Sequence, residues 1–409
     1  MISVQEALRQ VLEGLPLVGC ERVMLRQAAG RVLGEEVVAS RDVPPFRNSA
    51  MDGYAVRASD VTRAEAEPTR LRVLETVGAG AAPSEPVRPG TATRIMTGSV
   101  VPDEADAVVK VEDTTEEGGW VLVRVPVPAG ANIRHPGEDM RRGEVVLTPG
   151  RLLRPADIGL LASLSAATMM VRQRPSVAIL STGDELVDVG EPVGPGQIVN
   201  SNAYTLAAAV EESGGVPVIL GVARDRPEIL RQAYEEALRE DVVLSTGGVS
   251  VGTFDYVRRI QAELGVQEKF WRVAQKPGKP ITYGLYQGRP VFGLPGNPVS
   301  TLVCFYLYVL PALRRLMGMR ESFLPAVDAL VDEDIATAEN LTDFIRCQVS
   351  ASAEGYRVRA TGTQSSGALR SMSTGDALVI SPPGTKILRR GATARAILLN
   401  GGAREESPF

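Results

Sequence analysis

The sequence is poor in the residues on which much metal and nucleophile chemistry depends. It holds one histidine, His135, and three cysteines, Cys20, Cys304 and Cys347. A multi-histidine metal site is therefore excluded, and three widely spaced cysteines give neither a disulfide framework nor a CxxC zinc pattern. Because there is only one histidine and no cysteine lies in a glycine-rich loop, neither a Ser–His–Asp nor a Cys–His catalytic set is indicated. His135 is expected to be structural.

Positive charge and long apolar runs are also scarce. The net charge is −5 at pH 7, which argues against a protein that binds nucleic acid through its phosphates. The first fifteen or so residues lack the basic and apolar regions of a signal peptide. The most apolar segment, 299–313, contains Pro311 and is too short to span a bilayer comfortably. The sequence therefore predicts no membrane, no nucleic acid partner and a cytoplasmic location.

Glycine and proline, by contrast, are abundant. The 409 residues include 41 glycines and 28 prolines, which predicts many tight turns and a site built from loops. The hydrophobic share of 44% and the charged share of 23% are ordinary for a globular protein. On length alone, roughly two to four domains are expected.

The first part of the chain predicts helices interrupted by a β-rich insertion. Ser3 and Glu6 form a capping-box pattern that opens a helix through about Leu12. A second helix is expected near 25–38 and a third over 151–165, which has Pro155 near its start. We expect residues 1–45 and 146–174 to form one discontinuous helical linker domain. Residues 46–145 carry short β-prone runs between turns and predict an inserted β-rich domain.

The second part changes rhythm twice. Between 175 and 320, short apolar runs alternate with helical stretches, which is the βαβ signature of a doubly wound parallel α/β domain. From 321 to 409, short strands between turns predict a small β-barrel. The predicted fold class is multidomain α+β and α/β, with a central parallel α/β domain.

Three glycine-rich segments follow strands of that central domain. They are "STGDEL" at 181–186, "STGGVSVG" at 245–252 and "LPGNPVS" at 294–300. Ligands of open α/β sheets bind outside the carboxyl ends of the strands, and turns and helix N-termini there offer N–H groups to anions. One such loop alone is an ordinary strand–helix connection, but three at one edge predict a ligand site.

The third segment has an unusually stiff composition. Pro295 and Pro298 fix φ, and Gly296 lets the backbone turn. Asn297 is placed to cap the helix that follows, with Pro298 as the first helical residue. We expect a rigid turn that aims its N–H groups at one place.

Charged residues accompany these loops. Glu185, Asp225 and Asp255 follow strands, and carboxylates around a phosphate cradle usually hold Mg²⁺. The alternative for Asp225 and Asp255 is helix capping. Lys276 and Lys279 stand three apart in "KPGKP", a frame that suits oxyanion binding, although a solvated turn is an equal alternative.

Small, tight polar segments also occur in the first half. Asp52 lies in "NSAMDGYAV" and Thr97 in "RIMTGSVVP", where both can line a site. The segment "NIRHPGEDMRRGE" mixes arginines with Glu138 and Asp139, and its alternative role is that of a charged surface loop.

Taken in order, these segments resemble one family. The segments "SAMDGYA", "IMTGS", "GED", "STGDEL", "SNAY", "STGGVSVGTFDY", "KPGKP" and "GLPGNPVS" occur in the order seen in molybdopterin molybdenumtransferases, including the E domain of gephyrin. Each motif alone is weakly specific, whereas the ordered set is highly specific. The match covers essentially the whole chain.

The resemblance implies an L-shaped, four-domain protomer that forms a homodimer with a shared active site. It implies that molybdate is inserted into adenylylated molybdopterin and that AMP is released, with Mg²⁺ required. The implied catalytic residues are Asp52, Thr97, Asp139, Glu185 and Asp225. The implied substrate-binding residues are Arg134, Ser250, Lys276, Lys279, Pro295, Gly296, Asn297, Pro298 and either Ser365 or Ser366. The implied metal ligands are Glu185, Asp255 and Asp225.

Some questions remain open at this level. Arg272 stands where some relatives carry a lysine, so the anion geometry there differs. Relatives that adenylylate molybdopterin share the α/β domain but are shorter, and gephyrin itself is a scaffold that has a further domain and a long linker. An adenylyltransferase partner and acceptor molybdoenzymes are implied as partners. The sequence does not decide between molybdate and tungstate.

Overall fold

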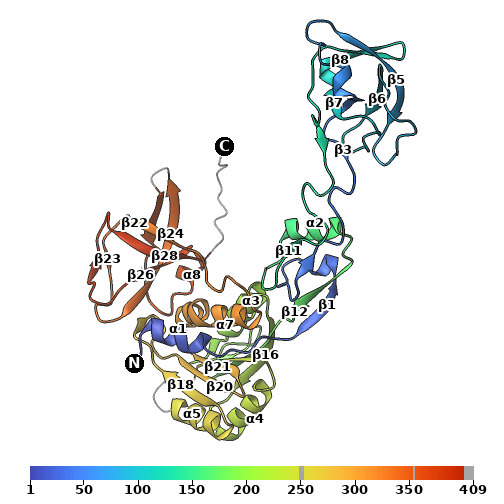
Figure 1. The fold of residues 1–409 in the computed structure, drawn as a ribbon. Coiled ribbons are helices and arrows are strands. Elements are labelled where there is room, and N and C mark those ends of the chain that lie inside the picture. Colours follow the sequence, from blue (N-terminus) through green and yellow to red (C-terminus); the bar gives the residue numbers. More distant parts are fainter. Residues whose placement is uncertain (248–252, 353–354, 400–409) are drawn as a thin grey trace.

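The protein folds into four parts that form an angled, extended molecule (Figure 1). The computed structural model describes residues 1–247, 253–352 and 355–399. The α/β domain carries the C-terminal barrel on one side and the linker domain on the other. The β-rich domain stands at the far end of the linker domain, away from the barrel.

The β-rich domain is built on one six-stranded sheet with the order β7-β4-β6-β5-β9-β8. Its strands are β4 (Gly53–Val56), β5 (Thr69–Val77), β6 (Thr91–Ile95), β7 (Ala107–Lys110), β8 (Thr114–Glu117) and β9 (Trp120–Val123). Tyr54, Val109 and Val121 belong to its buried core. A short antiparallel pair, β3 (Asn48–Ser49) with β10 (Ile133–Arg134), forms the stem that joins this domain to the linker domain.

The linker domain contains more strand than the sequence predicts. Its elements are β1 (Cys20–Met24), β2 (Val37–Val38), β11 (Val145–Leu147), α2 (Pro155–Ser163) and β12 (Thr168–Arg172). The strands pair antiparallel, β1 with β12 and β2 with β11. The predicted helix over 151–165 is confirmed as α2.

The predicted helix near 25–38 is wrong. Only a 3₁₀ turn at Leu25–Gln27 forms, and the chain then turns at Gly30, where φ is +72°. A side chain at Gly34 would lie 2.9 Å from the Cys20 sulfur, so the chain passes too close to β1 for a helix. The turn at Gly30 and the contact at Gly34 outweigh the helix propensity of the other residues in this segment.

The first helix, α1 (Val4–Leu12), begins as predicted, because the Ser3 hydroxyl accepts the Glu6 N–H at 3.1 Å. Its buried residues Ala7 and Val11, however, pack in the core of the α/β domain. α1 therefore packs on the α/β domain, whereas Leu161 of α2 belongs to the core of the linker domain. Apolar burial against the sheet decides where α1 lies.

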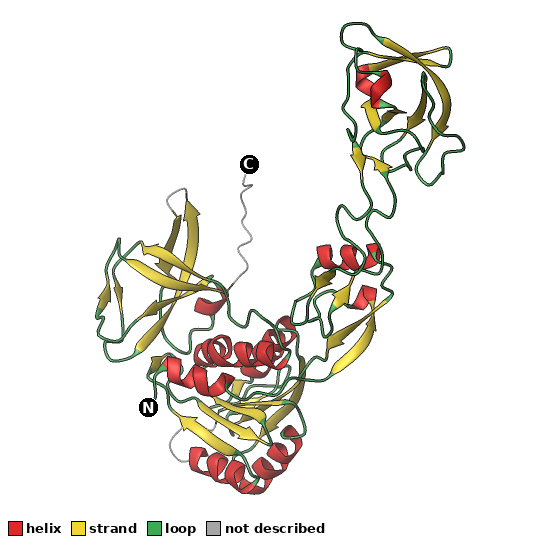
Figure 2. Cartoon of the chain, in the orientation of Figure 1, coloured by secondary structure: helices red, strands yellow, loops and turns green. Residues whose placement is uncertain are grey.

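The α/β domain has a six-stranded sheet with the order β16-β13-β17-β21-β20-β18. Its strands are β13 (Ser176–Thr182), β16 (Val216–Ala223), β17 (Val242–Thr246), β18 (Gln267–Trp271), β20 (Thr282–Tyr286) and β21 (Arg289–Leu294), and a side pair is formed by β14 (Leu186–Val187) and β15 (Ile198–Val199). Helices α1, α3 (Ser201–Glu212), α6 (Pro298–Cys304) and α7 (Leu310–Leu316) cover one face, while α4 (Pro227–Ala237) and α5 (Thr253–Glu263) cover the other (Figure 2).

The predicted parallel sheet is confirmed for its four strands and is extended at one edge by two further strands. Strands β16, β13, β17 and β21 are parallel, but β20 is antiparallel to both β21 and β18. The cause is a two-residue hairpin at Gln287 and Gly288, which have φ of 50° and 82°. Positive φ at both central residues suits a tight hairpin and excludes a crossover helix.

One apolar helical run links the sheet to the barrel. α6, a π-helical turn at Phe305–Val309 and α7 form a continuous run over 298–316. By length and composition this run is able to cross a membrane, yet 72% of its most apolar stretch is buried inside the protein. Phe305 and Tyr308 pack against the sheet, and Val299 and Val303 pack against the barrel. It is therefore a core helix.

The C-terminal barrel closes on itself in the order β24-β25-β22-β28-β26, with β26 pairing back to β24. Its elements are β22 (Ala326–Val331), β23 (Ile335–Ala336), β24 (Thr342–Ser352), β25 (Gly355–Ala360), α8 (Arg370–Ser373), β26 (Ala377–Ser381), β27 (Ile387–Leu388) and β28 (Thr393–Leu398). A short strand from the α/β domain, β19 (Gln275–Lys276), extends the barrel sheet by pairing with β24.

The close approach of backbone at Gly53 gives a stability prediction. A side chain there would overlap the Val109 carbonyl oxygen across the β4–β7 pair. We expect Gly53→Ala to destabilise the β-rich domain by about 2 kcal/mol or more, since the sheet must open to accept the methyl group. Scanning calorimetry and limited proteolysis of that domain measure the loss. Gly78→Ala is the control, because it meets no atom within 4 Å; equal stability of the two variants would contradict the prediction.

Candidate active site

The predicted loops lie together at the carboxyl edge of the parallel strands. Because β13 pairs with β16 and β17, and β17 pairs with β21, the loops after these four strands are neighbours. The segment 248–252, with Ser250, lies outside the described residues, as does the side chain of Asp255. α5 begins at Thr253, so Asp255 belongs to its first turn.

Three carboxylates, Asp184, Glu185 and Asp225, lie near one another at the ends of β13 and β16. The Asp225 N–H donates to Asp184 Oδ1 at 3.3 Å, and Arg224 Nη1 donates to the Asp184 carbonyl at 2.6 Å. Burial raises the pKa of Asp225, and the negative charges of Asp184 and Glu185 raise it further. The loop after β16 is thus fixed to the loop after β13 in a strongly negative setting.

One carboxylate oxygen of Asp225 is buried without a hydrogen bond. Its Oδ1 is enclosed and has no hydrogen-bond partner in the described part of the chain. Helix capping does not account for Asp225, because the cap residue of α4 is Arg226 and no side chain caps it. An enclosed carboxylate oxygen beside two further carboxylates is a setting in which a cation is stabilising.

The carboxylates present can supply some, but not all, of the ligands of a magnesium ion. Among the residues that the structure describes, no three His, Cys, Asp or Glu side chains converge on one point as metal ligands. Magnesium is usually held by one or two carboxylates, with water and substrate phosphates completing the octahedron. Asp225 and Glu185 satisfy that smaller requirement with hard oxygen donors.

A cationic cavity of about 470 Å³, which we call the junction cavity, lies where the α/β domain meets the barrel. It is lined by Gln275, Lys276, Pro277, Gly278, Lys279, Pro280, Asn297, Ser300, Leu341, Gln364, Ser365 and Ser366. The predicted lysines, the stiff turn and both candidate serines therefore come together in one place. Lys279 is exposed, and Lys276 Nζ lies 3.6 Å from Asp343 Oδ2.

The "KPGKP" segment is packed rather than merely solvated. Pro277 and Gly278 are buried, and a side chain at Gly278, where φ is +90°, would lie 2.5 Å from the Cys304 sulfur in α6. Only glycine permits this approach of the segment to the helix. The frame around Lys276 and Lys279 is therefore rigid, which favours the oxyanion interpretation over a solvated turn.

The turn between β21 and α6 is stiff as predicted but is fastened differently. Pro298 is the first residue of α6, whereas the Asn297 side chain does not cap the helix. Asn297 Nδ2 donates instead to Ser366 Oγ at 3.0 Å, and the Val299 N–H donates to the Ser366 carbonyl at 3.1 Å. The expected capping role of Asn297 is wrong, because the barrel supplies a competing acceptor.

The turn leaves donors available for a ligand. Pro295 and Pro298 have no N–H group, and within the described residues the N–H groups of Gly296 and Asn297 have no hydrogen-bond partner. The Pro295 carbonyl accepts the Thr301 hydroxyl, which closes the turn. Two adjacent N–H groups beside a helix N-terminus form an arrangement that suits an anion.

The sequence interpretation missed Arg346. This arginine of β24 is 1% exposed and donates to Ser371 Oγ at 3.2 Å and to the carbonyls of Thr363 and Ser365 at 3.4 and 3.1 Å. It therefore fixes the segment that carries Ser365 and Ser366. The available signal was an arginine inside an apolar strand, "FIRCQV". Arg272, in contrast, stacks on the Trp271 ring at 3.9 Å and does not line the cavity.

Asp52 and Thr97 form a second, separate cluster near the stem of the β-rich domain. Asp52 Oδ1 accepts both the Thr97 N–H and the Thr97 hydroxyl at 2.7 Å. These bonds, the backbone bond above all, lower the pKa of Asp52. The carboxylate is therefore ionised at neutral pH and held in one orientation at the surface.

Arg134 and Asp139 line a cavity of about 440 Å³ at the same stem, together with Val43, Pro44, Asn48 and Glu138. His135 lies in a tight turn here, in which its N–H donates to Glu138 Oε2 at 3.0 Å and its carbonyl accepts the Glu138 N–H at 3.1 Å.

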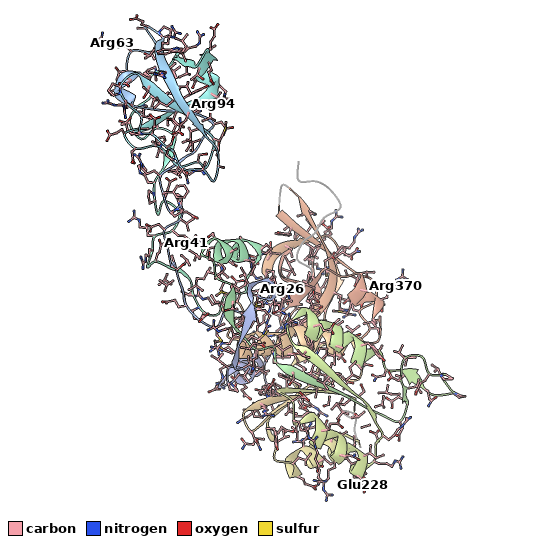
Figure 3. The ribbon with its side chains drawn as sticks, turned by 90° about the vertical axis from the view of Figure 1, so that its right-hand side faces the viewer. Arg26, Arg41, Arg63, Arg94, Glu228 and Arg370 are labelled. Carbon is pink, nitrogen blue, oxygen red and sulfur yellow. The ribbon has the colours of Figure 1, made fainter. Side chains whose placement is uncertain are left out.

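Within one chain the two clusters lie on different domains. The stem cluster (Asp52, Thr97, Arg134 and Asp139) belongs to the β-rich end, and the edge cluster (Glu185, Asp225, Lys276, Lys279, 295–298 and Ser366) to the α/β domain and barrel. Figures 1 and 3 show these ends of the molecule far apart, joined by the linker domain. One protomer therefore does not bring all predicted site residues together.

Comparison with known families accounts for almost the whole chain. Residues 2–165 match the MoeA N-terminal region (domain I and II), residues 178–315 match a probable molybdopterin binding domain, and residues 328–399 match the MoeA C-terminal region (domain IV). A molybdopterin molybdenumtransferase of Staphylococcus aureus (strain COL) is 34% identical over 407 residues, which is 99% of this chain and 97% of the relative. This chain belongs to the MoeA family.

Solved structures agree with this assignment. The MoeA protein of Pyrococcus horikoshii OT3 is 34% identical and superposes with a TM-score of 0.85, covering 97% of this chain and 100% of that one. A molybdenum cofactor biosynthesis protein from Pyrococcus furiosus, 23% identical with a TM-score of 0.60, shares the fold. The predicted multidomain fold class and family resemblance are confirmed.

The raised pKa of Asp225 predicts a pH-dependent stability cost. The folded state holds the Asp225 proton more tightly than the unfolded chain, so stability falls as pH rises from the unfolded pKa through the folded one. At a pH above both pKa values, the cost of the ionised group is fully present. We expect Asp225→Asn to raise the free energy of unfolding at pH 7 by on the order of 0.5 kcal/mol.

Thermal unfolding at pH 7 and at pH 3 measures this effect. The gain is expected to vanish at the lower pH, where the wild-type carboxyl is protonated too. Asp328→Asn, on the barrel surface, is the control, because Asp328 is paired with Arg395 rather than placed beside other carboxylates. A stability gain for Asp225→Asn that is the same at both pH values would contradict the electrostatic cause.

Proposed function

We propose that this chain inserts molybdate into adenylylated molybdopterin and releases AMP, completing the molybdenum cofactor. The names of the curated relatives and full-length membership of the family support molybdenum insertion into molybdopterin. The observation that carries the finer proposal is the junction cavity, where two lysines and a stiff turn come together at the sheet edge that also carries the carboxylates after β13 and β16. A pyrophosphate and a tetrahedral oxyanion need such donors and cations.

In this proposal each group has a defined task. Lys276 and Lys279 attract the oxyanions, and the N–H groups of Gly296 and Asn297 orient them. Ser366, held by Asn297 and through Arg346, fixes the barrel side of the cavity. Because Asp343 is 5% exposed and lies beside Lys276, it orients that ammonium group.

Magnesium is the proposed cofactor. Glu185 and Asp225, with Asp255 from the first turn of α5, would hold it, and when bound it would neutralise charge that develops on the pyrophosphate. The enclosed, unpartnered Oδ1 of Asp225 supports this assignment.

The other activities are less well supported. An adenylyltransferase needs only the α/β domain, whereas matches to the family regions over 2–165 and 328–399 place this chain with the insertion enzymes. A scaffold role has no comparable support from the site. We propose that the protein acts in the cytoplasm, receives its substrate from an adenylyltransferase partner and passes the cofactor to acceptor molybdoenzymes.

A homodimer with shared sites is the proposed assembly. The stem cluster of one chain does not reach its own edge cluster, so a second copy is needed to supply it. Two features mark where copies would meet: β16 is the terminal strand of its sheet, and Val216 and Ile219 on it are 45% and 41% exposed. An exposed apolar edge strand of this kind is usually covered by another segment, and we propose that a second copy of the chain covers it.

The first test is AMP release from adenylylated molybdopterin with magnesium, in the presence and absence of molybdate. We expect wild-type release to depend on molybdate. Glu185→Ala is expected to lower the rate by about 100-fold or more, since a ligand of the metal or phosphate is lost. Glu191→Ala, in the exposed turn that follows, is the control. Release that does not depend on molybdate would overturn metal insertion.

The second test asks whether sites are shared. Heterodimers of an Asp52→Ala chain and a Glu185→Ala chain, purified through two different tags, contain one site with both residues intact. We expect about half of the wild-type activity, since a symmetric dimer has two equivalent sites. A heterodimer of Asp52→Ala and Thr97→Ala is the control and is expected to stay inactive, because both sites then carry a damaged stem cluster. If the Asp52→Ala and Glu185→Ala heterodimer is no more active than the two variant homodimers, the active sites are not shared.

A further inference from the structure

Two asparagines at the start of α3 connect the loops of the edge cluster. Asn200 is the cap residue of α3, and Asn202 lies in its first turn. Neither was among the site residues predicted from the sequence, and neither lines the junction cavity. Their side chains nevertheless reach two of the loops from which the site is built.

Asn200 ties together the ends of two strands. It is 2% exposed, and its Oδ1 accepts the Ser181 hydroxyl of β13 at 2.9 Å and the Ala203 N–H at 3.4 Å. Ser181 Oγ in turn accepts the Thr246 hydroxyl of β17 at 3.3 Å. This buried chain of bonds sets the spacing of the strand ends from which the first two loops leave.

Asn202 fastens the third loop. Its Nδ2 donates to the Gly296 carbonyl at 2.8 Å, across 94 residues of sequence. Gly296 also packs against the loop after β17, because a side chain on it would lie 3.7 Å from Gly247 Cα. The orientation of the peptide unit between Gly296 and Asn297 therefore depends on one side-chain amide from α3.

The same peptide unit carries the N–H of Asn297, one of the groups proposed to face the ligand. Fixing the Gly296 carbonyl fixes the Asn297 N–H on the same peptide plane. The Asn297 side chain then reaches Ser366 Oγ at 3.0 Å on the barrel. The Asn202 bond on one side of the turn thus influences the position of the Asn297 groups on the other side. A misplacement of such groups by about 1 Å is enough to slow a reaction severely.

We propose that Asn202 is a positioning residue of the active site, which holds the 295–298 turn so that the Asn297 N–H and the Asn297–Ser366 contact face the oxyanion. It does so without touching substrate, and Asn200 sets the strand ends beside it. The kinetic part of this inference rests on the proposed function, but the structural part does not.

The structural part is tested by amide hydrogen exchange of Asn202→Ala. We expect exchange in peptides covering 295–301 and 363–369 to rise by roughly three- to tenfold, since the loss of one hydrogen bond loosens the turn locally. Ser213→Ala is the matched control: it removes a side chain–backbone bond, Ser213 Oγ to the Ala209 carbonyl at 2.6 Å, at the other end of the same helix. No change at 295–301, or an equal rise throughout the α/β domain, would overturn the proposal.

The kinetic part is tested by a double-mutant cycle. Asn202→Ala is expected to lower kcat for molybdate-dependent AMP release by roughly tenfold with little change in KM. If Asn202 acts through Asn297, the double variant with Asn297→Ala loses no more activity than the worse single variant. Multiplicative losses would refute this route. Wild-type protein without molybdate-dependent release would instead refute the proposed function, while the exchange result would still decide the role of Asn202.

Discussion

The burial of one helix between two domains is the constraint on which the rest of the site depends. The run over 298–316 packs on the parallel sheet through Phe305 and Tyr308 and on the barrel through Val299 and Val303. Its first turn is therefore held from both sides by apolar contacts. Because the turn at 295–298 leads straight into this helix, its N–H groups have fixed positions before any ligand arrives.

Electrostatics then distribute charge around this rigid element. Burial and the neighbouring carboxylates Asp184 and Glu185 raise the pKa of Asp225, which costs folding free energy, whereas the lysines of "KPGKP" stand in a packed frame. This separation of negative from positive groups suits the ligand proposed for the site, which brings both a cation and oxyanions.

The linker domain gives the molecule its reach. Short strand pairs, not long helices, carry the β-rich domain away from the sheet edge, and the stem at β3 and β10 holds Asp52, Thr97, Arg134 and Asp139 at that distant end. As a result, the stem cluster and the edge cluster of one chain lie far apart. A second copy that brings the stem cluster of one protomer to the sheet edge of the other would turn this separation into a site that closes only on assembly.

The sequence by itself determined the local features whose causes are local. The start of α1 at Ser3, the alternation of strands and helices, the turn at 295–298 and the ordered family motifs all follow from residues close together in the chain. Tertiary structure decided what depends on distant partners. The helix expected at 25–38 gave way to packing of Gly34 on Cys20, and Asn297 turned from its own helix to Ser366. Arg346, Asp343 and Asn202 act on segments between 19 and 94 residues away or across a domain boundary. A sequence pattern can mark such a residue, as it does for Arg346, but it does not name the bonding partner, because burial and hydrogen-bond competition are settled only when the domains pack together.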